Sequence, residues 1–139
     1  MPVPSEYQQA TQDFTDFLLT ARDIAGLSST HQAFTMAQGV FLVFRRRLSL
    51  PDAIRFACIL PPGLRALFVD EWDPDAVQLP FASRERMTRE VQALRPLHNF
   101  APDTCIQDVA AALRRHVASP ALDSLLASLP VEAQRFWSV

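Results

Sequence analysis

The chain has 139 residues, enough for one domain that buries roughly two-thirds of its unfolded surface. With 49% hydrophobic residues, 20% charged residues and a formal net charge of -2, it is neither a disordered chain nor a strongly basic nucleic-acid binder. Its apolar runs are too short to span a membrane, and its first residues lack the basic and apolar regions of a secretory signal. We therefore expect a cytoplasmic protein with no membrane contact.

The apolar pattern predicts four helices in the first half of the chain. A stripe at helical spacing predicts the first over about residues 6–25, and Gly26 is suited to end it. Ser28 or Ser29 is expected to cap a second helix, and Ser29 has capping-box spacing to Gln32. This helix is expected to run to about Arg47, because the arginines before that point complement the C-terminal end of the helix dipole. A third helix is predicted over about residues 50–59, followed by a short fourth helix that opens with proline.

An acidic connector over about residues 70–82 precedes four further helices. These are expected to begin at about residues 83, 102, 119 and 130. Pro96 is expected to end the first of them, because proline cannot continue a helix. No window alternates apolar and polar residues as a strand does, so the sequence predicts no strands.

The second half of the chain repeats the first. A shift of 69 positions without a gap aligns eight identities between residues 35 and 68 with the later part of the chain. The identical pairs are Thr35–Thr104, Gln38–Gln107, Val40–Val109, Arg45–Arg114, Arg46–Arg115, Pro51–Pro120, Leu60–Leu129 and Pro61–Pro130. A fixed period indicates one supersecondary unit used twice. We predict an all-α single domain over 1–139, a bundle of about eight helices from two tandem four-helix repeats (about 6–70 and 83–139) with pseudo-twofold symmetry.

One motif resembles a known family. The string Leu60-Pro61-x-x-Leu64-Arg65-x-Leu67-Phe68, followed by Trp72-Asp73-Pro74, is similar to the bacterial domain of unknown function 2267 family, and Leu129-Pro130 with Phe136-Trp137 matches a second such ending. The resemblance covers the chain from about residue 10 onward. It implies a small all-helical bacterial protein and brings no established activity or catalytic residues. The chain departs from a simple duplication in two places. Pro96 cuts the first helix of the second repeat, and the acidic segment around Trp72 has no counterpart after Trp137.

The sequence contains no recognisable catalytic or metal-binding constellation. Its three histidines are dispersed, and Asp70, Asp73 and Asp75 lack the glycine and the glutamate of a calcium loop. Cys58 and Cys105 are expected to be free, buried and chemically inert, since no base lies near either in sequence. Three glycines cannot form a glycine-rich phosphate cradle. We predict no catalytic residue, metal or cofactor.

A polar stripe is duplicated without a clear packing reason. Its residues are expected opposite the apolar face of the second helix and of its repeat: Thr35, Gln38, Arg45, Arg46, Thr104, Gln107, Arg114 and Arg115. One interpretation is helix solubility with compensation of the helix dipole. The other is a pair of basic patches that bind a carboxylate-bearing partner or a nucleic-acid backbone.

Three functional hypotheses stay open. The first is a non-catalytic protein-interaction module that binds an unknown protein partner or itself, and it follows from the duplication and the lack of a catalytic constellation. The second is a helical pocket between the two repeats that binds a small molecule or works as an enzyme. The third is weak nucleic-acid binding through the duplicated arginines, against which stand the net charge and the lack of an aromatic platform.

Overall fold

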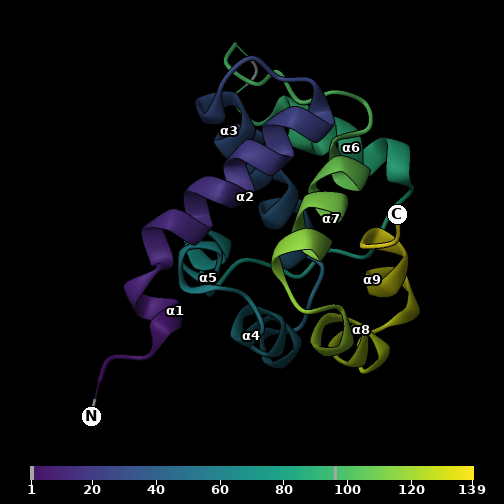
Figure 1. Ribbon diagram of the computed structural model, residues 1–139. Coiled ribbons are helices and arrows are strands. Elements are labelled where there is room, and N and C mark those ends of the chain that lie inside the picture. The colour runs from purple at the N-terminus through teal and green to yellow at the C-terminus, as the bar shows by residue number, and fades with distance from the viewer. Residues whose placement is uncertain (1, 96) are drawn as a thin grey trace.

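The computed structural model describes residues 2–95 and 97–139, which form nine helices and no strand (Figure 1). The helices are α1 (Ser5–Gln8), α2 (Ala10–Ala25), α3 (Thr30–Arg45), α4 (Leu50–Cys58), α5 (Pro62–Val69), α6 (Arg84–Ala93), α7 (Cys105–His116), α8 (Ser119–Ala127) and α9 (Val131–Phe136). The predicted all-α class is confirmed, and the helices pack into a bundle. No helix in these residues has the length and apolar character needed to cross a bilayer.

Most helix ends follow the capping residues in the sequence. The Oγ atoms of Ser29, Ser49 and Ser83 accept hydrogen bonds from backbone N–H groups at the starts of α3, α4 and α6. Gly26 ends α2 with φ 70°, a left-handed conformation that glycine adopts without steric cost. The predicted end of a helix at Pro96 lies outside the described residues.

The predicted first helix is wrong in one respect, because the chain breaks at Gln9 into α1 and α2. Gln9 has φ -100° and ψ 10°, away from helical values. Tyr7, which was expected in the apolar stripe, is 51% exposed on α1. Only the part of the stripe on α2 reaches the core, where Phe17 and Ala21 are fully buried.

Helix α3 lies at the centre of the molecule. It packs against α2, α5, α6 and α7, and ten of its 16 residues are buried. Figure 1 shows α2 and α7 side by side over this central helix. Because neighbouring helices cover α3 on most sides, it has little surface left for solvent.

An aromatic cluster joins the two halves of the chain at the C-terminal end of α3. The Phe44 ring lies 4.9 Å from that of Phe56 and 4.8 Å from that of Phe136, measured between centroids. The rings of Phe68 and Trp137 are 5.8 and 5.9 Å from that of Phe41. Aromatic pairs at these separations stabilise a core beyond the area they bury.

The helix starts recur at the spacing of the sequence repeat. Helices α4 and α8 each have nine residues and begin at residues 50 and 119, which are 69 positions apart. Helices α5 and α9 begin at residues 62 and 131, again 69 apart. The division of the chain into two tandem repeats stays a prediction, and this recurrence is consistent with it.

We expect Gly63→Ala to lower the free energy of unfolding by about 1–2 kcal/mol. A Cβ atom at Gly63 would lie 2.9 Å from Cβ of Phe14, so α5 and α2 would have to move apart. Urea denaturation measures the change. Ala66→Gly, on the exposed side of α5, is the control for helix propensity and costs up to about 1 kcal/mol. A Gly63→Ala protein at least as stable as the wild type would show that the two helices do not depend on this close approach.

Candidate functional site

The duplicated polar stripe does not form one solvent-exposed face. Thr35 and Arg45 are buried, with 3% and 6% of their surface exposed. The other members are half-buried (Gln38, Arg46 and Arg114) or exposed (Thr104, Gln107 and Arg115). The prediction that the stripe lies opposite the core is therefore wrong for Thr35 and Arg45. The reason is that α3 lies at the centre of the molecule, so its neighbours cover most of the face that was expected to be exposed to solvent.

Arg45 holds the end of α5 and the start of the connector. Its Nη1 donates to the carbonyl oxygens of Phe68 at 2.9 Å and Asp70 at 2.7 Å. Its guanidinium carbon lies 5.4 Å from the centre of the Trp72 ring, within the range of a cation–π contact. Burial, and next the charge of Arg46, lower the pKa of Arg45 below its ordinary value. The side chain is a buried structural donor.

The second copy of this arginine makes an equivalent contact. Nε of Arg114 donates to the carbonyl oxygen of Trp137 at 3.1 Å, and both Arg45 and Arg114 reach 23 residues forward. Phe68 and Trp137 are themselves 69 positions apart. Arg45 and Arg114 thus make the same polar contact in each half, which accounts for the recurrence of this pair without an external ligand.

A second polar contact also recurs at this spacing. Nη2 of Arg65 donates to the carbonyl oxygen of Leu60 at 3.0 Å, and Nε2 of Gln134 donates to that of Leu129 at 3.4 Å. Each donor lies five residues after its acceptor. These side chains occupy the carbonyls left without partners where α4 and α8 end.

Arg46 and Arg47 share one carboxylate on α6. Nη1 of Arg46 lies 3.2 Å from Oε1 of Glu90, and Nη2 of Arg47 donates to its Oε2. Burial alone would raise the pKa of Glu90, but the hydrogen bonds and charges of Arg47 and then Arg46 outweigh it and hold that pKa below its usual range. The ion pairs fix the end of α3 against α6.

Backbone and amide groups hold the connector to the same helix end. Arg47 donates from Nε to the carbonyl oxygen of Pro80 at 3.1 Å. In return, the backbone N–H of Leu79 donates to the carbonyl of Arg46 at 2.9 Å, and Nε2 of Gln78 donates to that of Arg47 at 3.2 Å. The connector has no helix or strand, yet both of its ends are fixed.

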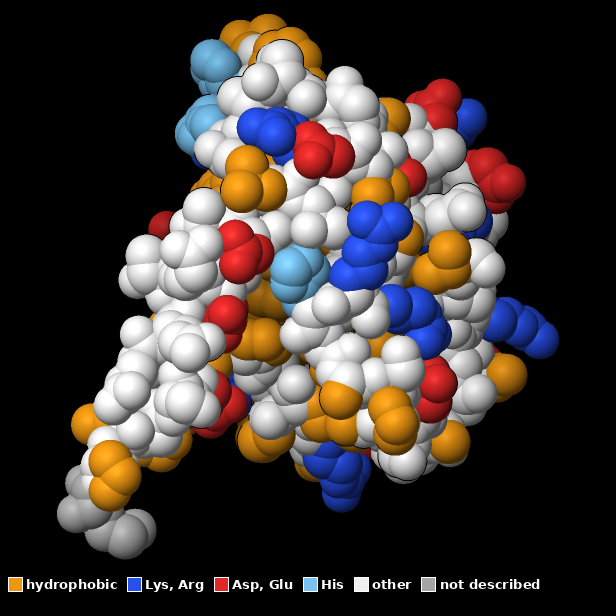
Figure 2. All heavy atoms as spheres, in the orientation of Figure 1, with side chains coloured by type: hydrophobic (Ala, Val, Ile, Leu, Met, Phe, Trp, Pro, Cys, Tyr) orange, Lys and Arg blue, Asp and Glu red, His pale blue; other side chains and the backbone are white. Residues whose placement is uncertain are grey.

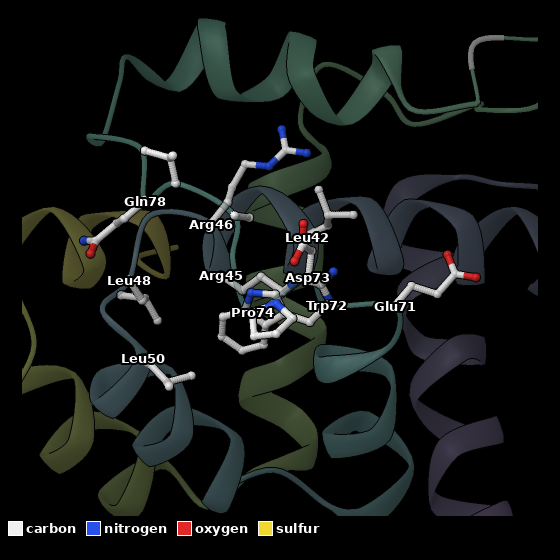
Figure 3. Close-up of a pocket in the computed structure, with 12 residues that line it drawn as sticks. Leu42, Arg45, Arg46, Leu48, Leu50, Glu71, Trp72, Asp73, Pro74 and Gln78 are labelled. Carbon is white, nitrogen blue, oxygen red and sulfur yellow. The ribbon is translucent and has the colours of Figure 1, made fainter.

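An open groove of about 540 Å³ lies between this connector, the end of α3 and the start of α4 (Figure 3). Its lining residues are Leu42, Arg45, Arg46, Leu48, Leu50, Glu71, Trp72, Asp73, Pro74, Ala76, Val77 and Gln78. Figure 3 shows Trp72 against Arg45 in the middle of the groove and Arg46 directed away toward α6. Two apolar side chains of the lining are largely in solvent, Val77 at 82% and Leu50 at 57% exposed. We call this feature the connector groove.

The backbone at the start of the connector is held in an uncommon conformation. Glu71, directly after the residue that caps α5, has φ 53°. This left-handed conformation costs a residue other than glycine about 1–2 kcal/mol. The next residue, Trp72, lies over Arg45, and the Glu71 side chain points away from the groove centre (Figure 3).

The connector gives the groove a negative edge. Four acidic and no basic residues lie between residues 70 and 82: Asp70, Glu71, Asp73 and Asp75. The whole chain has a formal charge of -2, so the rest of it sums to -2 minus -4, or +2. The two arginines of the lining offset only part of this charge: Arg45 interacts with Asp70 and Glu71, and Arg46 pairs with Glu90.

A second hollow lies between the two halves. Residues of α1, α2 and α4 line it on one side, and those around the end of α7 line it on the other, with a volume of about 420 Å³. Figure 2 shows acidic side chains along α2 and arginines along α7 on the two sides of a gap whose base is apolar. The lining includes Cys58 and His116. We call it the interhalf cleft.

The cysteines differ from their prediction in one case. Cys105 is fully buried as expected, and burial raises the pKa of its thiol to about 12, so it is protonated at neutral pH. Cys58 is exposed at the end of α4, because the helix turns this position away from the core. Among the described residues, no three His, Cys, Asp or Glu side chains are grouped to hold a metal ion.

Sequence reasoning missed the residues that build the connector groove. Leu50 and Val77 were not singled out, because an exposed aliphatic residue has no motif and its neighbours across the groove are distant in sequence. Glu90 was missed for the same reason. One signal was available: three consecutive arginines at the end of an apolar helix require acceptors if that end is buried.

We expect Arg45→Met to lower the free energy of unfolding by about 2–3 kcal/mol, because the carbonyls of Phe68 and Asp70 lose their buried donor. Arg114→Met should cost less, since one carbonyl is affected there. Arg115→Met, at an exposed position, is the control and should change stability by less than about 0.5 kcal/mol. Chemical denaturation gives the order, and equal small effects at all three positions would restore the surface interpretation of the stripe.

We expect Glu90→Gln to be less stable than the wild type by about 1–3 kcal/mol at neutral pH. The folded-state pKa of Glu90 is lowered, so its contribution is fully present above the unfolded value of about 4.5 and is lost as the pH falls through the folded value. Denaturation at a series of pH values from about 7 to about 3 should show the difference shrinking below about pH 4.5.

Asp108 does not disturb this comparison. Burial raises its pKa in spite of the hydrogen bond from Thr104, and it titrates in both proteins. A stability difference that stays constant down to about pH 3 would mean that the carboxylate of Glu90 does not carry the effect.

The chain matches one family model over nearly all of its helical part. The model, described as "Uncharacterized conserved protein (DUF2267)", covers residues 14–136, from within α2 to the end of α9. A search of curated proteins finds no match. The family model matches far more than half of the chain and agrees with the resemblance of the Leu-Pro motifs. The chain therefore belongs to the DUF2267 family of uncharacterized conserved proteins.

Proposed function

We propose that this protein is a non-catalytic module that binds another protein through the connector groove. The observation that carries the proposal is the pair of protruding apolar side chains on a rigidly held groove, Val77 and Leu50. Exposed apolar side chains gathered around a groove are typical of a surface that a partner covers. Trp72, half-buried between them and Arg45, is of the residue type that contributes most to protein interfaces.

The shape of the groove favours a macromolecule over a small ligand. A small ligand inside the groove would leave most of Val77 in water, whereas the surface of a protein partner can cover the groove and both rims. The connector is also held at both ends, which lowers the entropy that binding would cost.

Of the duplicated arginines, Arg45, Arg46 and Arg114 are engaged within the molecule and give little support to nucleic-acid binding. Arg45 donates to backbone carbonyls inside the molecule, and Arg114 is engaged with Trp137 and with Asp123. The acidic connector would also repel a phosphate backbone. We therefore do not carry this hypothesis forward.

The interhalf cleft supports a second candidate, a small-molecule site. Its volume of about 420 Å³ lies within the range of ligand sites, and both halves of the chain line it. Cys58 is its one thiol and is exposed, so iodoacetamide labelling can report occupancy. This candidate would be favoured over the first by two results together: a metabolite protects Cys58 from labelling, and replacement of Leu50 and Val77 does not change which proteins are retained.

The main test compares two double variants in affinity capture from the organism that produces the protein. Leu50→Ser with Val77→Ser should lose the proteins that the wild type retains, because serine removes apolar area from both rims. Leu97→Ser with Val131→Ser is the matched control: these residues are 87% and 51% exposed and do not line the groove. Retention that is the same for both double variants, or no retention by the wild type, would contradict the proposal.

A further inference from the structure

The connector groove combines a negative edge with an apolar lining, and this combination defines the chemistry of its occupant. Glu71 and Asp73 line the groove together with the exposed apolar residues Leu50 and Val77, and Asp70 and Asp75 adjoin them along the connector. A partner that fits must therefore bring cations next to apolar side chains. Complementary charge at the rim of an interface directs encounter and rejects partners of the wrong sign.

The arginines inside the groove do not provide that complement themselves. Arg45 is 6% exposed, and its Nη1 donates to two backbone carbonyls. Arg46 turns toward Glu90 on α6, as Figure 3 shows. Among the described residues, neither Asp73 nor Asp75 forms an ion pair with an arginine or histidine. Their negative charges are therefore available to cationic groups of a partner.

The fold also restricts the conformation of the occupant. Recognition by addition of a strand needs an open sheet edge, and the described residues contain no sheet. An amphipathic helix laid in a groove needs only an apolar lining and a polar rim. The connector groove, bounded by α3, α4 and an irregular segment, meets this second requirement.

We propose that the connector groove binds an amphipathic helical segment of another protein, one that carries lysine or arginine beside its apolar face. This inference rests on the proposed function and specifies the partner. Leucine-sized side chains would lie against Leu48, Leu50 and Val77, and the flanking cations would meet Asp73 and Asp75.

A synthetic probe tests the inference directly. The probe is a 16-residue amphipathic helix made of leucine and lysine, and its counterpart has glutamate in place of lysine. Trp72 is half-buried in the groove and Trp137 is fully buried in the core, so a shift in tryptophan emission on binding reports mainly on Trp72. We expect saturable binding of the lysine peptide, with a Kd on the order of micromolar, and at least about tenfold weaker binding of the glutamate peptide.

Charge variants locate the effect on the connector. Glu71→Gln, Asp73→Asn and Asp75→Asn together should weaken binding of the lysine peptide by about tenfold and reduce its dependence on salt. Asparagine at position 73 keeps an Oδ1 that can accept the N–H of residue 75. The matched control replaces three exposed glutamates elsewhere, Glu6→Gln, Glu85→Gln and Glu132→Gln, with the same change in net charge, and should alter binding by less than about twofold.

The outcomes separate this inference from the proposed function. Equal binding of both peptides, lost in the Leu50→Ser and Val77→Ser variant, would overturn the basic partner and leave a protein-binding groove. Binding of neither peptide would overturn the helical basic segment as occupant. Binding that survives loss of Leu50 and Val77 would remove the groove as the site. A stable homodimer in sedimentation that excludes the peptide would make a second copy the occupant and overturn the inference.

Discussion

The burial of one helix end is the constraint on which the rest of this structure depends. Helix α3 ends inside the molecule at Arg45, where water cannot serve its last carbonyl groups. The chain meets this need from its own residues: Arg47 and Leu48 donate to the last carbonyls of α3. Just beyond the helix, Leu79 and Gln78 donate to the carbonyls of Arg46 and Arg47. The arginines in turn donate to carbonyls of α5 and the connector. The end of α3 and the connector thus hold each other in place, because each supplies hydrogen-bond partners for the polar groups of the other.

This exchange has an electrostatic result. Three arginines lie side by side in sequence, but their cationic groups are directed to backbone carbonyls and to Glu90. The acidic side chains that follow them are directed to solvent. A segment beside three arginines therefore presents negative charge. A count of charges along the sequence would suggest a neutral region, because such a count does not record which groups are buried.

The sequence predicted the helices well because their signals are local. Serine caps, Gly26 and the helix-opening prolines act within one turn, so the starts and ends of α3 and α4 and the start of α5 fall within two residues of expectation. The break at Gln9 was missed because nothing in its immediate neighbourhood marks it.

The candidate site was predicted much less well, because its contacts join distant positions. The periodicity of the second helix indicates one apolar face, but it does not reveal that four other helices surround α3. Arg45 therefore seemed to belong to a solvent face. The partners of Arg45 and Arg47 outside α3 lie 23 to 43 residues away, and their identity depends on how the chain after α3 folds back on it. The Leu-Pro motifs identified the family and carried no information on the groove.

The two arginine contacts also differ from the aromatic cluster in the length of chain that they close. Each links residues 23 apart within its own half, whereas Phe44 and Trp137 are 93 positions apart. Closing the longer loop costs about 1.2 kcal/mol more chain entropy, since the cost grows with the logarithm of loop length. Contacts of short range are therefore favoured early in folding. On this ground we expect each half of the chain to form its own polar contact before the shared aromatic core.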